Sequence, residues 1–129
     1  MARLLVVDDE PNNLEVARII AEAEGHDVVL ASNGQLALDQ LDAGPFDLML
    51  VDVLMPVMDG ITFTRTVRRD PTHGQVKILG VTAKASQADQ SEMLAAGMDA
   101  ILLKPFRRKS LLEAISKLMD STVDASPAA

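Results

Sequence analysis

Cysteine is absent from this 129-residue sequence. Its absence excludes a disulfide scaffold, a thiolate zinc site, a Cys-ligated iron–sulfur cluster and a thiol nucleophile. Long apolar runs are also absent: none approaches the roughly 20 residues that a membrane span requires, and the N-terminal run is too short for a signal peptide. We therefore expect a cytoplasmic protein that does not enter a membrane.

Aromatic and basic residues are scarce. The sequence has no Trp, no Tyr and three Phe, and 12 Lys and Arg stand against 19 Asp and Glu, which gives a net charge of −7. A surface with this charge repels a phosphate backbone. We therefore expect no binding of nucleic acid.

The composition that remains is typical of one globular domain. Hydrophobic residues make up 48% of the chain and charged residues 24%, and the length allows a single core. We assign residues 1–120 to one domain. The small, polar stretch 121–129 is expected to be a flexible tail.

Short apolar runs alternate with amphipathic segments of helical period along this domain. Strands are predicted at Leu4–Val7, Val28–Ala31, Leu48–Val51, Val76–Val81 and Ala100–Leu103. Helices are predicted near residues 12–24, 34–42, 60–69, 87–96 and 107–119. Most of the strands have no polar residue at alternate positions, as expected when helices cover both faces of a parallel sheet. The pattern predicts a doubly wound α/β fold of five strand–helix units.

Side chains capable of chemistry come directly after four of the predicted strands. Asp8 and Asp9 follow the first strand, Asp52 follows the third, Thr82 the fourth and Lys104 the fifth. Each of them taken alone is more often a helix cap, a turn residue or a solvated charge. Because the carboxyl ends of parallel strands lie along one edge of a sheet, we expect all of them to meet in one cleft. This joint placement indicates a functional site.

The gathered aspartates predict a cation. Carboxylates a few ångströms apart repel one another and raise one another's pKa unless a positive ion joins them. Oxygen ligands at this density suit Mg²⁺, whereas softer metals lack ligands, since His26 and His73 lie in or beside predicted loops away from these strand ends. Mg²⁺ held by carboxylates usually orients a phosphoryl group. The candidate nucleophile is then a carboxylate, which can form an acyl phosphate.

Four spaced motifs resemble those of the receiver domain of two-component response regulators, over residues 3 to about 119. They are Leu4–Glu10 (LLVVDDE), Leu50–Gly60 (LVDVLMPVMDG), Val81–Ala83 (VTA), and Ala96–Asp99 (AGMD) leading to Leu103–Phe106 (LKPF). The resemblance implies a flavodoxin-like (βα)5 three-layer sandwich whose five-stranded parallel sheet has the order 2-1-3-4-5. It also implies a phosphoacceptor that assists its own phosphorylation and dephosphorylation, rather than an enzyme.

The resemblance assigns a role to each acidic residue. Asp52 receives a phosphoryl group from a phosphohistidine of a histidine kinase or a histidine phosphotransfer protein. Asp9 ligates Mg²⁺ directly and Asp8 mainly through water. Asp52 and the backbone carbonyl of Leu54 complete the ligands that the protein supplies, and Mn²⁺ can substitute for Mg²⁺.

Two further residues respond to the phosphoryl group in this family. Lys104 pairs with one phosphoryl oxygen, and the Lys104–Pro105 peptide is typically cis. Thr82 moves its hydroxyl onto another phosphoryl oxygen. These roles suit the residues, because the amine offsets the added negative charge and a small hydroxyl can move as a switch.

One position departs from the family pattern. Ile101 stands three residues before the lysine, where the family usually carries Tyr or Phe. Without an aromatic ring there, we expect the conformational response to phosphorylation to stay within the loop after Thr82 and the helix over 87–96. The apolar stripe of that helix, Met93 and Leu94, is thin.

Other positions carry weaker expectations. Leu54 and Lys84 occupy the two places that tune the lifetime of the phosphate in this family; a leucine shields the acyl phosphate from water, and a lysine can add an ion pair. Arg65, Arg68 and Arg69 are expected on an exposed helix face. The run Arg107–Lys109 lies at the start of a predicted helix, where the helix dipole disfavours positive charge. We interpret it as a solvated basic turn or as a turn whose charge is compensated by a nearby acid.

The expected protein is a stand-alone receiver that acts through protein contacts, without a DNA-binding output domain. A downstream protein would meet the face formed by the helix over 87–96, the strand Ala100–Leu103 and the helix over 107–119. A phosphotransfer domain would meet the helix over 12–24. The protein is expected to be a monomer or to form a dimer on phosphorylation.

Three alternatives stay open. An aspartate phosphatase of the haloacid dehalogenase type would need a second Asp where Leu54 stands. A flavodoxin would bring a phosphate to its first loop, where Asp8–Glu10 would repel it. A degenerate receiver would bind partners without phosphorylation, and only Ile101 favours it.

Overall fold

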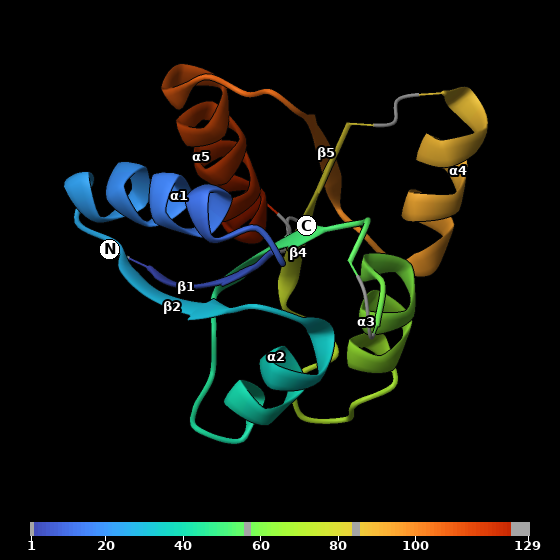
Figure 1. The fold of residues 1–129 in the computed structure, drawn as a ribbon. Coiled ribbons are helices and arrows are strands. Elements are labelled where there is room, and N and C mark those ends of the chain that lie inside the picture. The colour runs from blue at the N-terminus through green and yellow to red at the C-terminus, as the bar shows by residue number, and fades with distance from the viewer. Residues whose placement is uncertain (1, 56–57, 84–85, 125–129) are drawn as a thin grey trace.

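The computed structural model describes residues 2–55, 58–83 and 86–124 as one α/β domain (Figure 1). Its strands are β1 (Arg3–Val7), β2 (Asp27–Ala31), β3 (Leu48–Asp52), β4 (Lys77–Thr82) and β5 (Ala100–Leu103). Its helices are α1 (Pro11–Ala23), α2 (Gly34–Leu41), α3 (Gly60–Arg68), α4 (Gln87–Ala96) and α5 (Arg108–Asp124). The sheet has the order β2-β1-β3-β4-β5 and all of its neighbouring strands are parallel. The predicted fold class and strand order are confirmed.

Helices cover both faces of the sheet and form three layers (Figure 1). Alternate residues of β1 contribute to the two cores that lie between the sheet and these helices. Leu4 and Val6 belong to the core beneath α1 and α5, whereas Leu5 and Val7 belong to the core beneath α2, α3 and α4. Successive side chains of a strand point to opposite faces, so a continuous apolar run supplies both cores. Among the described residues, no helix is long and apolar enough to cross a bilayer.

Several helices begin at a side-chain cap and one ends at a left-handed glycine. The side chains of Asn33, Asp59 and Ser86 accept hydrogen bonds from the amides of the first turns of α2, α3 and α4, at 2.8, 2.8 and 3.0 Å. These short polar side chains satisfy amides that have no partner within the helix. Gly97 follows α4 with φ of +118°, a conformation that a side chain disfavours.

The observed bounds differ from the prediction in an informative way. β3 and β4 each continue one residue further than expected, so Asp52 and Thr82 occupy the last strand positions and not the following loops. α5 runs to Asp124, which places residues 121–124 of the expected tail in the helix; the rest of that tail lies outside the described residues. The sequence has no glycine or proline between residue 108 and Pro127 that would stop the helix earlier.

The expectation of an exposed face at the end of α3 is wrong for one of its arginines. Arg65 and Arg69 are exposed, but the side chain of Arg68 is only 22% exposed. It turns inward and donates hydrogen bonds to backbone carbonyls. The basic start of α5 is compensated by an acid at one position, since Arg108 pairs with Glu24 at 3.1 Å.

Candidate functional site

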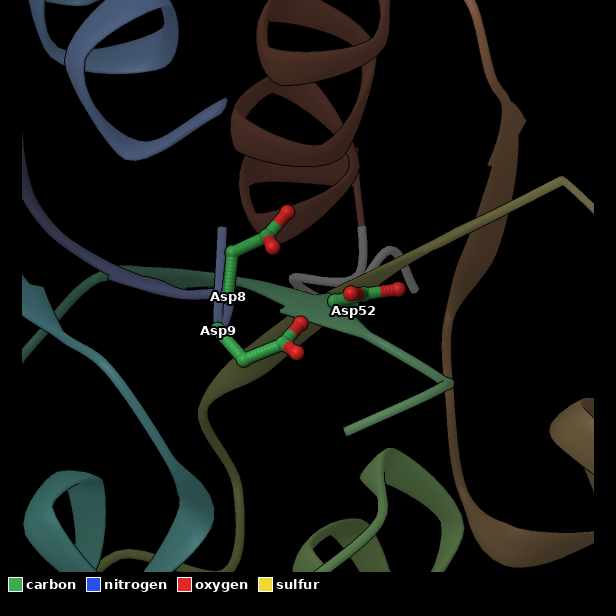
Figure 2. Close-up of side chains that lie close together, drawn as sticks. All are labelled: Asp8, Asp9 and Asp52. Carbon is green, nitrogen blue, oxygen red and sulfur yellow. The ribbon is translucent and has the colours of Figure 1, made fainter. Parts of the chain in front are cut away.

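Three aspartates meet at the carboxyl edge of the sheet. Asp8 and Asp9 directly follow β1, and Asp52 ends the adjacent strand β3, where Val7 lies opposite Val51. A carboxylate oxygen of each aspartate lies within 4.8 Å of the others. Figure 2 shows the three side chains leaving these two neighbouring strand ends. The structure thus brings together the acidic residues that the sequence placed at one edge.

Lys104 joins this cluster from the loop after β5. Its Nζ donates to Asp8 Oδ2 at 3.1 Å and lies 3.4 Å from Asp52 Oδ2. The Lys104–Pro105 peptide is cis, as the family resemblance implies. The ammonium group therefore lies between two carboxylates that belong to different strands.

Thr82 is tied to Lys104 through the backbone. The Lys104 amide donates to the Thr82 carbonyl at 2.8 Å, and Thr82 lies opposite Leu103 in β5. The Thr82 side chain is buried on the edge of the sheet that carries the aspartates. A hydroxyl and an amine are thus held on adjacent strand ends beside the acidic cluster.

Burial governs the electrostatics of Asp52, whose residue surface is 5% exposed. Burial and, next, the charge of Asp8 raise the pKa of Asp52 from 3.8 to about 6. The Lys104 ammonium and the Leu54 amide, which donates to Asp52 Oδ1 at 3.3 Å, act in the opposite direction without cancelling the rise. Burial by itself would lower the pKa of Lys104, but the hydrogen bond to Asp8 and the charge of Asp52 raise it above its ordinary value. The site therefore carries an excess of negative charge that one amine does not neutralise.

This donor set fits a hard divalent cation. It offers oxygen atoms of three carboxylates, two of them buried, and Mg²⁺ is bound in proteins through one or two carboxylates while it keeps several waters. The described histidines lie elsewhere: His26 accepts a hydrogen bond from the Ala2 amide at the opposite end of β1. Asp8, Asp9 and Asp52 could thus hold Mg²⁺.

The expectations for Leu54, Lys84 and Ile101 are among those that remain without a test. A metal-binding role for the Leu54 carbonyl stays a prediction, because the contact seen at Leu54 is the one from its amide. Lys84 lies outside the described residues, as do Pro56 and Val57 of the loop after Asp52. Ile101 is half-buried and packs against the core beneath α2, α3 and α4.

Gly60 is a functional candidate that the sequence analysis named only as the last residue of the motif Leu50–Gly60. A Cβ on Gly60 would overlap the carbonyl oxygen of Asp52 and lie 2.8 Å from Val53 Cα. The Gly60 amide also donates to the Val53 carbonyl at 2.9 Å. The first turn of α3 therefore presses on the backbone of Asp52, and only a residue without a side chain allows this approach.

A doubly wound parallel sheet with an acidic cluster and a bridging lysine at its carboxyl edge defines a flavodoxin-like domain with a candidate Mg²⁺ site. The family model of the response regulator receiver domain matches residues 4–116. The chain belongs to this family of two-component signalling domains.

Individual relatives agree with the family. The chain is 36% identical over 118 residues to the sensor histidine kinase GacS of Pseudomonas protegens, a match that covers 89% of this chain and 13% of that protein. It is similar to the chemotaxis protein CheY4 of Vibrio cholerae, with a TM-score of 0.88, 31% identity, and coverage of 92% of this chain and 98% of that one. The receiver domain of sensor histidine kinase PA1611 from Pseudomonas aeruginosa, which has a magnesium ion in its active-site cleft, matches with a TM-score of 0.85, 32% identity, and coverage of 92% and 98%.

The raised pKa of Asp52 predicts a pH-dependent effect of its removal. An acid whose pKa is raised by folding binds its proton more tightly in the folded protein, so its contribution to the free energy of unfolding falls as pH rises from about 4 to about 6. In metal-free buffer we expect Asp52→Asn to raise the Tm at pH 8, and this gain to shrink toward pH 4. Thermal unfolding followed by far-UV circular dichroism measures it, and an equal gain at both pH values contradicts it.

The contact at Gly60 predicts that one added methyl group disturbs the site. We expect Gly60→Ala to lower the free energy of unfolding by about 1–3 kcal/mol, as overpacking does. Because the methyl group displaces the Asp52 backbone, we also expect weaker binding of Mg²⁺. Urea unfolding with and without Mg²⁺ measures both effects. Thr62→Ala, at an exposed position in the same helix, is the control, and a Gly60→Ala protein that matches this control in both measurements refutes the role.

Proposed function

We propose that this receiver domain accepts a phosphoryl group on Asp52 in a Mg²⁺-dependent reaction and thereby alters its contacts with other proteins. The observation that carries the proposal is the setting of Asp52. Its carboxylate is buried at the end of β3, lies 3.4 Å from the Lys104 amine, and shares a cluster with Asp8 and Asp9. A nucleophilic carboxylate, an amine for a phosphoryl oxygen and a set of metal ligands are thus within reach of one another.

In the proposed reaction, a carboxylate oxygen of Asp52 attacks the phosphorus of a phosphohistidine in line with the leaving nitrogen. The new P–O bond forms as the P–N bond breaks, and the electron pair of that bond returns to the imidazole, which takes up a proton. Lys104 shifts from its two carboxylate partners to a phosphoryl oxygen. Mg²⁺, or Mn²⁺ in its place, held by Asp8, Asp9, Asp52 and the Leu54 carbonyl, would neutralise charge on the phosphoryl oxygens. Thr82 donates its hydroxyl to another of these oxygens.

The donor of the phosphoryl group is a histidine kinase or a histidine phosphotransfer protein, and it would dock on α1. Two residues of α1 support this position: Val16 is 48% exposed and Ile19 is 57% exposed. Val16 also borders a hollow that Pro105 and Phe106 line beside Lys104. An apolar surface that leads directly to the site suits a partner that must bring its histidine to Asp52.

The output would use the face formed by α4, β5 and α5. Leu94 and Leu103 are 51% and 45% exposed on α4 and β5, which supports a protein contact there. We propose a cytoplasmic domain that is a monomer or that forms a dimer through phosphorylation, and that does not bind nucleic acid, as its charge of −7 favours. The alternative, a module that binds partners without phosphorylation, rests on Ile101 alone.

The direct test is incubation with acetyl phosphate. With Mg²⁺ we expect intact-mass spectrometry to show the gain of one phosphoryl group on the wild-type protein, and no gain after removal of Mg²⁺ by a chelator. Asp52→Asn should stay unmodified, because an amide is a poor nucleophile. Asp47→Asn, a change at a carboxylate that binds the Arg3 amide at 2.8 Å, should be modified like the wild type. Modification that persists in Asp52→Asn excludes Asp52 as the acceptor.

The lifetime of the phosphorylated form tests the role proposed for Leu54. Its amide contacts Asp52, and its side chain is 50% exposed, so it can limit the approach of water to the acyl phosphate. We expect Leu54→Ala to shorten the half-life of the phosphorylated protein several-fold, measured by intact mass after removal of the donor. Leu36→Ala, at a leucine of α2 that is 45% exposed, controls for the general effect of the change. Equal half-lives in Leu54→Ala and the wild type remove the shielding role.

A further inference from the structure

Asn13 is a half-buried polar residue beside the acidic cluster. It lies in the first turn of α1, four residues before Ala17, which is buried. Residues four apart in a helix share a face, so Asn13 lies on the side of α1 that turns toward the sheet. An apolar side chain would suit this face, and a polar side chain that is partly buried normally has a hydrogen-bond partner.

The carboxamide of Asn13 makes no hydrogen bond within the described part of the chain; the contact of this residue is that of its backbone amide, which donates to the Glu10 carbonyl at 3.0 Å. The carboxylate of Asp8, by contrast, has both oxygens engaged. Its Oδ1 accepts from the Glu10 amide at 2.9 Å, and its Oδ2 accepts from Lys104 Nζ at 3.1 Å. The Asn13 carboxamide is therefore available to a molecule that enters the site.

Asn13 borders two spaces that reach the site from different sides. The inner space is a narrow gap that Asp8 and Asp52 also line. The outer space is a hollow of about 370 Å³ that Lys104 also lines. Asn13 thus lies between the proposed phosphoacceptor and the hollow through which a phosphodonor would reach it.

The outer hollow suits a small flat ring with one polar edge. Its volume lies within the range of small-molecule sites, which are mostly apolar and contain a few polar groups that fix the orientation of the ligand. Two of the described residues that line it are polar, Asn13 and Lys104, and Lys104 already contacts two carboxylates. The other described lining residues are apolar: Val16, Ala83, Pro105 and Phe106.

The leaving group of the proposed reaction would lie on the side of this hollow. In-line displacement places the leaving nitrogen opposite the attacking oxygen of Asp52, and so away from the floor of the site. Lys104 is assigned to a phosphoryl oxygen, which leaves the Asn13 carboxamide for the group that departs. The imidazole ring of a phosphohistidine is flat, has apolar faces and carries its polar atoms on its edge.

We propose that Asn13 selects phosphohistidine as the donor, because its Oδ1 accepts a hydrogen bond from the N–H of the ring nitrogen that does not carry phosphorus. The inference rests on the proposed phosphorylation of Asp52 and names the residue that recognises the leaving group. When the P–N bond breaks, its electron pair stays on the nitrogen that carried phosphorus. The proton on the other nitrogen makes the departing ring a neutral imidazole. A hydrogen bond to the protonated, charged form of the ring favours that form, which is the better leaving group.

Two small phosphodonors test this selection without a partner protein. Phosphoimidazole provides the ring N–H, whereas acetyl phosphate leaves as acetate, which has no N–H. With Mg²⁺ present, we expect Asn13→Ala to lower the second-order rate constant of phosphorylation by phosphoimidazole about fivefold or more, the size expected for one lost hydrogen bond. The rate constant for acetyl phosphate should stay close to that of the wild type. Intact mass follows both reactions, and Asn12→Ala, a change at an exposed residue of the same turn, should alter neither.

Two further measurements separate recognition of the donor from a structural role. Because the Asn13 carboxamide has no bond to lose and alanine favours a helix, Asn13→Ala should keep or raise the Tm. Its affinity for Mg²⁺ should equal that of the wild type. A lower Tm or a weaker affinity for Mg²⁺ assigns Asn13 to the structure or to the metal site and overturns the inference.

The two donors also separate failure of this inference from failure of the proposed function. Equal slowing of both donors in Asn13→Ala, or a rate with phosphoimidazole that equals that of Asn12→Ala, overturns the selection while Asp52 is still phosphorylated. Absence of a phosphoryl group on Asp52 of the wild type with either donor refutes the proposed function itself.

Discussion

Repulsion between carboxylates that the fold forces together is the constraint on which the site depends. Asp8 follows β1 and Asp52 ends the adjacent strand β3, and both are buried, so neither can turn away into water. One amine contacts both of them, yet burial and, next, the charge of Asp8 keep the pKa of Asp52 raised to about 6. Additional positive charge at this edge of the sheet would therefore be stabilising.

The sheet and the members of the site could be predicted because both follow from a simple geometric rule. Continuous apolar runs such as Leu48–Val51 identified buried parallel strands, and the carboxyl ends of such strands share an edge. Asp8, Asp52 and Lys104, which are far apart in the sequence, were therefore expected together, and the structure places them together. Strand ends were predicted one residue too short at Asp52 and Thr82, since polar residues that end a strand look like loop residues in a sequence.

The contacts of Arg68 and Gly60 could not be predicted in the same way. Arg68 binds mainly carbonyl oxygens, and the positions of these depend on how distant loops close and not on which residues the loops contain. An arginine at the end of a helix is usually exposed, so the general rule pointed away from its actual role. Gly60 is the first residue of α3, a position that gives no sign of a backbone contact in the sequence, and its close approach to Asp52 becomes visible only in three dimensions.

The pressure of Gly60 against Asp52 also bears on how such a domain can be recombined. At Gly60, the first turn of α3 meets the end of β3 through backbone atoms, so no side chain at this point can adjust to a new neighbour. A chimera that exchanges β3 and α3 as one block preserves this fit. A junction placed between Asp52 and Gly60 would instead join a strand from one parent to a helix from another. A small difference in the position of that helix would then produce a steric clash with the backbone of Asp52.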